Sequence, residues 1–106
     1  MPKYLIQGNY TAEGAKGLLK DGGSKRVKAA KAAMKAVGGK VDAMYFAFGD
    51  TDVYAIVDAP DNASMTALSL TVAGTGALSI TTTALLTPKE VDEASTKAVT
   101  YKPPGQ

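Results

Sequence analysis

The fold is decided by residues 41–59, which read VDAMYFAFGDTDVYAIVDA. Two β-favouring runs, 41–48 and 53–59, flank residues 49–52, a Gly, Asp and Thr cluster of the kind found in tight turns. We therefore expect a β-hairpin. If Phe48 pairs with Val53, strand alternation gives each face its own residues. One face holds Met44, Phe46, Phe48, Val53, Ala55 and Val57, and the other holds Tyr45, Ala47, Tyr54 and Ile56.

Upstream of the hairpin, the pattern predicts one strand and two helical segments. Residues 3–10 are β-favouring and end at Thr11, which is a suitable N-cap for a weak helix over residues 12–20. Ser24 is expected to cap a stronger helix over residues 25–37, and the Gly38-Gly39 pair is expected to end it.

Downstream of the hairpin, the order is helix, strand and helix. Asp61 or Asn62 can cap a helix over residues 63–73, and residues 78–86 form a threonine-rich strand. Thr87 and Glu90 match a capping box with Pro88 at the first helical position, so a short C-terminal helix should begin there. Residues 99–106 form an extended tail.

This succession predicts an α+β fold of the ferredoxin-like type. The β-α-β-β-α-β order gives an antiparallel sheet that carries its two main helices on one face, with a short C-terminal helix added. The wholly apolar face of the hairpin should pack against the helices. The other sheet face, with Tyr45 and Tyr54, is left open.

Length and composition exclude several classes of protein and of site. The chain has 106 residues, so we expect a single domain over residues 1–106. It has no Cys and no His, which removes disulfides, thiolate nucleophiles, His-based triads and the usual zinc sites, and we expect no metal or cofactor. A net charge of +2 gives little basis for nucleic-acid binding. No apolar run reaches membrane-spanning length and no leader pattern is seen, so a cytoplasmic protein is expected.

Three stretches resemble the GYD domain family. They are YLIQGNYT at residues 4–11, YFAFGDTDVY at residues 45–54, and LLTP at residues 85–88 followed by Glu90. The family's Gly, Tyr, Asp signature lies at the hairpin turn, where this chain has Thr51 in place of the expected tyrosine. The resemblance implies a ferredoxin-like, dimeric α/β-barrel architecture. It supplies no catalytic residue.

The open sheet face is the main candidate for function. A four-stranded sheet of this size presents roughly 400 Å² per face, within the range of about 300–600 Å² for the largest apolar patches on monomers. A second copy, or a small ligand in a cleft, should cover it. The candidate dimer-interface or ligand-binding residues are Gln7, Asn9, Tyr45, Asp52, Tyr54, Thr81 and Thr83.

Other polar clusters have structural explanations. Asp50 and Asp52 suit the turn, where a carboxylate bonds to backbone, better than a metal site. Lys28, Lys31 and Lys35 fit a solvated helix face, because no aromatic residues accompany them as they do in single-strand binders.

Three functions remain open at this point. The first is a homodimeric interaction or small-ligand-binding module without catalytic residues. The second is a cofactor-free oxygenase- or isomerase-type enzyme, in which Tyr45, Tyr54 or Asp52 would manage a proton. The third is a structural subunit of an assembly.

Overall fold

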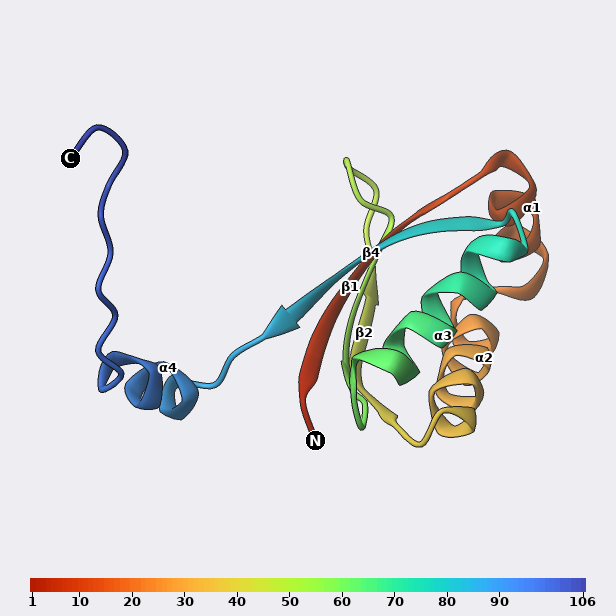
Figure 1. Cartoon of the computed structure of the whole chain (residues 1–106). Helices are drawn as coiled ribbons and strands as arrows, with labels where there is room; N and C mark the ends of the chain where they lie inside the picture. Colours follow the sequence, from red (N-terminus) through yellow and green to blue (C-terminus); the bar gives the residue numbers. More distant parts are fainter.

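The computed structural model describes residues 1–106 and has the expected α+β, ferredoxin-like architecture. Four strands form one antiparallel sheet in the order β2-β3-β1-β4, and helices α1, α2 and α3 cover one of its faces (Figure 1). The elements are β1 (Lys3–Tyr10), α1 (Ala12–Asp21), α2 (Gly23–Ala36), β2 (Lys40–Phe46), β3 (Val53–Asp58), α3 (Asn62–Gly74), β4 (Leu78–Leu85) and α4 (Pro88–Ser95).

The core lies between this sheet face and the helices. Its largest fully buried side chains are those of Met34 from α2 and Val57 from β3, and α3 contributes Met65 and Leu68. Tyr4 of β1 is also buried, and its hydroxyl donates to Asn62 Oδ1 at 2.6 Å, which ties β1 to the start of α3. A buried tyrosine needs such a partner for its hydroxyl.

The hairpin forms as expected, but its paired strands are shorter and its loop is longer than the sequence predicts. Phe46, and not Phe48, pairs with Val53, so residues 47–52 form a longer loop. Phe48 was expected in the apolar face that packs on the helices, and this is wrong, because its side chain is fully exposed in the loop. The Ala47 N–H donates to Asp52 O at 2.7 Å and closes the loop two residues earlier than the hydrophobic pattern predicts.

The helix ends follow local backbone chemistry. Thr11 caps α1, Asp61 caps α3, and Gly38, with φ of +82°, follows the end of α2. The expected N-cap at Ser24 is wrong. Gly22, with φ of +80°, joins α1 directly to α2, so α2 begins at Gly23 before Ser24 is reached.

The C-terminal arm, residues 86–106, lies apart from the rest of the chain. Its helix α4 has the expected capping box between Thr87 and Glu90. Every residue of the arm is exposed, and Figure 1 shows α4 well away from the sheet. The chain consequently has a radius of gyration of 17.0 Å, against about 13 Å for a compact chain of this length. None of the helices combines the length and hydropathy of a membrane span.

Candidate functional site

The open face of the sheet carries a row of side chains that crosses all four strands. Tyr45 pairs with Tyr54, Tyr54 pairs with Gln7, and Gln7 pairs with Thr81. Paired residues in a sheet point to the same face, so these four side chains lie side by side. Tyr45 is 72% exposed and Tyr54 is 39% exposed, which leaves most of the aromatic surface of the row in solvent.

A second row lies next to the first. Ala43 pairs with Ile56, Ile56 with Leu5, and Leu5 with Thr83. Asn9 lies on the same face at the other side of the first row, opposite Ser79. The predicted residues Gln7, Asn9, Tyr45, Tyr54, Thr81 and Thr83 are therefore brought to one surface, here called the open face. Apolar and aromatic side chains occupy most of its β2–β3 half, which ends at the charged pair Lys40 and Asp58. On β4 the open face carries Ser and Thr and ends at Leu85.

Asp52 serves the backbone of the fold. Its Oδ2 accepts from the Tyr10 N–H at 2.9 Å, and its own N–H donates to Gly8 O at 2.9 Å. These two bonds fasten the hairpin loop to β1. The interpretation of Asp52 as a carboxylate that bonds to backbone is confirmed, although its partner is on a neighbouring strand and not within the turn. Asp50 is exposed, and no group of three acidic side chains comes together.

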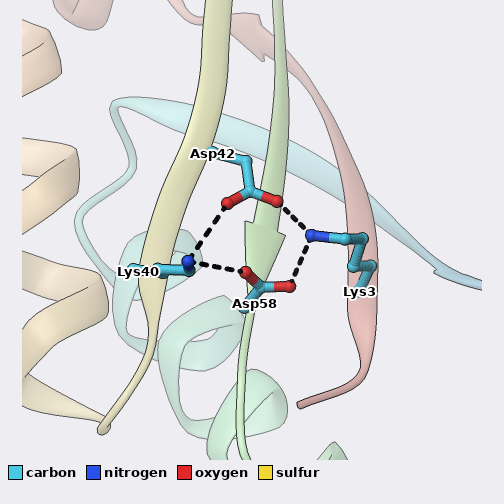
Figure 2. A network of polar contacts seen from close by, with 4 residues as sticks. All are labelled: Lys3, Lys40, Asp42 and Asp58. Atoms are coloured by element: carbon cyan, nitrogen blue, oxygen red, sulfur yellow. Dashed lines mark hydrogen bonds and ion pairs between the residues drawn. The ribbon is translucent and has the colours of Figure 1, made fainter.

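A four-residue ion-pair cluster lies at the end of the sheet where β1 begins (Figure 2). Lys3 bonds to Asp42 and, at 2.9 Å, to Asp58, while Lys40 lies 3.6 Å from Asp58. A bulge between Val41 and Ala43 in β2 accompanies the placement of Asp42 toward Lys3, two strands away.

The two lysines of this cluster compensate the buried negative charge of Asp58. Asp58 is only 5% exposed, and the hydrogen bond from Lys3 holds the pKa of its carboxyl below the ordinary value. The hydrogen bonds to Asp42 and Asp58 raise the pKa of Lys3 in turn. Sequence patterns do not predict this cluster, because its members come from three strands whose pairing the sequence alone does not reveal.

A cavity of about 290 Å³ lies on the opposite side of the sheet, between the strands and the helices. Its lining is mainly apolar, and small residues of the helices make the space. Gly14 and Gly17 come from α1, and Ala29, Ala30 and Ala33 come from α2. Met34 and Met44 also line it. The sequence predicts a weak helix over residues 12–20, and this prediction does not include a cavity. The sequence feature that could have indicated the cavity is the set of small residues on one side of two successive helices.

Polar side chains at the cavity are those of Tyr10, Glu13, Arg26 and Thr75, and the Thr75 hydroxyl already donates to Val72 O at 2.7 Å. Burial raises the pKa of the Tyr10 hydroxyl, and the neighbouring Arg26 guanidinium acts in the opposite direction. Arg26 has one carboxylate neighbour, Asp21, whose Oδ2 lies 3.8 Å from its nearer guanidinium nitrogen. That distance is too long for a hydrogen bond, so the donors of Arg26 remain available.

The volume and lining of this cavity are typical of a ligand pocket. Ligand pockets of about 300–1,000 Å³ have the same apolar lining with a few polar groups, and 290 Å³ lies at the lower end of that range. The cavity is partly open to solvent, which gives a small molecule access to it.

The lysines of α2 make no ion pair with another element. Lys28, Lys31 and Lys35 are all exposed, as a solvated helix face would be.

Comparisons with known proteins give one match. A protein-family model described as GYD domain matches residues 4–95, which covers the sheet, the three packed helices and α4. No curated protein matches, and no solved structure does either.

Proposed function

The chain belongs to the GYD domain family, and from this premise we propose that it works as a homodimeric interaction module. In the proposed dimer, the open face of one copy packs against the open face of a second, and the C-terminal arm of each copy lies on its partner. A twofold axis makes such an interface self-complementary.

The exposed surface of the single chain is the observation that carries the proposal. It amounts to 7467 Å², whereas a compact chain of 10.9 kDa exposes about 5,600 Å². The excess of roughly 1,900 Å² is more than the roughly 800 Å² that each partner buries in a stable interface. Association of two copies would remove much of this excess from water.

The arm supports the same proposal. Helices shorter than about 12 residues are marginal in water, and α4 has eight residues, all exposed. Large apolar side chains of the arm also face solvent, namely Leu86, Val91, Val99 and Tyr101. Packing of the arm against a second copy would bury these side chains and stabilise α4.

The composition of the open face suits an interface. Tyrosine is enriched at protein interfaces, because its ring contributes buried area while its hydroxyl can stay hydrated. Tyr45 and Tyr54 lie at one end of the row, and the neutral Gln7 and Thr81 lie at the other. The four residues of this row carry no charge that a second copy would repel.

The enzyme hypothesis gains no comparable support. It requires Tyr45, Tyr54 or Asp52 to manage a proton, and the Asp52 carboxylate already accepts a hydrogen bond from the Tyr10 N–H. The proposed function therefore contains no reaction.

Sedimentation velocity tests the proposal. We expect the chain to sediment as a dimer at micromolar concentration, and Tyr45→Arg to shift it to monomer, because the substitution places two charges in the paired face. Leu19→Arg is the matched control. Leu19 is also an exposed apolar residue, but it lies on α1 in the helix layer, so its replacement should leave the dimer intact.

A monomer at micromolar concentration would overturn the proposed function. A dimer that Leu19→Arg breaks and Tyr45→Arg does not would move the interface to the helix layer, and it would also refute pairing through the open face.

A further inference from the structure

The cavity between the helices and the sheet points to a second function on the other side of the molecule. It lies on the helix-covered face, whereas the proposed dimer uses the open face. The two proposals therefore stand on different residues, and either can fail without the other.

We propose that this cavity binds a small apolar molecule that carries one carboxylate, with the carboxylate held by Arg26 and Tyr10. A volume of about 290 Å³ lies at the lower end of the range for ligand pockets and accommodates roughly a dozen non-hydrogen atoms. A medium-chain fatty acid or a single-ring aromatic acid has this size.

The apolar part of the ligand is inferred from the lining. Gly14, Gly17, Ala30 and Ala33 keep the space open from the helices. Ile6, Val53 and Ile80 contribute aliphatic surface from the sheet. Such a lining offers no hydrogen-bond partner to a polar molecule, so it favours an aliphatic or aromatic body.

The carboxylate is inferred from two donors in the wall of the same cavity. Arg26 and Tyr10 both line the cavity and both are partly buried, and the positive charge of Arg26 acts to lower the pKa of the Tyr10 hydroxyl. A guanidinium with free donors matches the two oxygens of a carboxylate. Glu13 also lines the cavity but is exposed, so it can remain in water when the ligand binds.

The four methionines allow a direct test by NMR. With ¹³C-labelled methionine methyl groups, Met34 and Met44 report on the cavity, while Met65 is buried outside it and Met1 is at the exposed N-terminus. Octanoate is the first probe. We expect saturable shifts of the Met34 and Met44 signals, with the Met1 and Met65 signals unchanged.

Two further probes test the head group. Octanol and octylammonium have the same chain as octanoate but offer no carboxylate. We expect octanoate to bind roughly tenfold more tightly than octanol, as a hydrogen-bonded charge would give. In Arg26→Met, which keeps much of the side-chain length, octanoate should bind no better than octanol.

Cavity-filling variants test the location. Ala30→Phe should abolish binding of all three probes, and Ala32→Phe, at an exposed position of the same helix, should not. Circular dichroism checks that each variant is folded. If Ala30→Phe does not fold, Ala33→Leu fills the same cavity with a smaller side chain.

Three results would overturn the inference. They are the absence of saturable shifts at millimolar octanoate, binding that persists in a folded cavity-filled variant, and octanol or octylammonium binding as tightly as octanoate. The association state measured by sedimentation affects none of these readouts.

Discussion

Two glycines three residues apart on α1 have opposite surroundings. A Cβ added at Gly14 would lie 1.9 Å from the carbonyl oxygen of Ala77, whereas a Cβ added at Gly17 would meet nothing within 4 Å. We expect Gly14→Ala to lower the free energy of unfolding by about 1–3 kcal/mol, because the added methyl group has no space beside the Ala77 carbonyl. Gly17→Ala should raise it by roughly 0.5–1 kcal/mol, because alanine favours the helix. Urea unfolding measures both.

Each of these variants is the control for the other, because they share a helix and a substitution. If both changes destabilised the chain equally, the close approach of α1 to the start of β4 would be refuted.

The Lys3–Asp58 pair gives a pH dependence of stability. The folded-state pKa of Asp58 lies below its ordinary value of 3.8, so its stabilising contribution is present above that value and is lost as the pH falls through the lower, folded pKa. We expect Asp58→Asn to lower the melting temperature at pH 7, and the difference from the unsubstituted chain to shrink in acid. Thermal melts from pH 7 to pH 2 measure this. Asp50→Asn replaces an exposed carboxylate and should change little at any pH.

At the scale of single residues, the sequence predicts helix N-caps well and side-chain contacts between strands poorly. Thr11 and Thr87 were expected as N-caps and are N-caps, and of the two alternatives Asp61 and Asn62 the N-cap is Asp61. In each case the capping side chain bonds to a backbone N–H only three residues away. Asp58 gave no such signal. Its partners are Lys3 and Lys40, and their proximity depends on the pairing of three strands.

At the scale of elements, hydrophobic alternation predicted the faces of the hairpin correctly and its turn incorrectly. Val53, Ala55 and Val57 are buried, as the pattern requires, and Tyr54 and Ile56 are on the open face. Phe48 continues the same alternation, but the bonds of Asp52 to Ala47, Gly8 and Tyr10 end the pairing before it. Backbone hydrogen bonds from a distant strand are not encoded in local periodicity.

Helix α4 depends on its capping box more than the packed helices depend on their N-caps, because every residue of α4 is exposed. Thr87 Oγ1 accepts from the Glu90 N–H at 3.1 Å, and Glu90 Oε1 accepts from the Thr87 N–H at 3.0 Å. Loss of an N-cap costs about 1 kcal/mol. If α4 folds against a second copy, each dimer contains two such helices, so Thr87→Ala costs about 2 kcal/mol per dimer and should weaken the dimer by about thirtyfold.

Sedimentation equilibrium measures this dimer constant, and ¹³Cα shifts over residues 88–95 report the helix content of α4. Thr71→Ala, at an exposed position of α3 in the helix layer, is the control and should leave both unchanged. A dimer constant that does not change when α4 loses its helical shifts would remove α4 from the interface.

At the scale of the whole molecule, the order of elements was sufficient to predict the fold. The topology that follows from it, β2-β3-β1-β4, brought Gln7, Tyr45, Tyr54 and Thr81 into one row. The position of the arm and the presence of the cavity could not be predicted. Both depend on how much space the packed elements leave, and small side chains set that space only after the helices are placed on the sheet.

The bulge at Asp42 limits how the chain can polymerise. Strand β2 is one edge of the sheet, and there the bulge breaks the regular register between Val41 and Ala43, beside the charged Lys40 and Asp42. Irregular, charged edges discourage the addition of a foreign strand. Strand β4, the other edge, has a regular register and a Ser- and Thr-rich sequence without charge. Strand addition is therefore disfavoured at β2, and addition through β4 alone joins two copies and stops there.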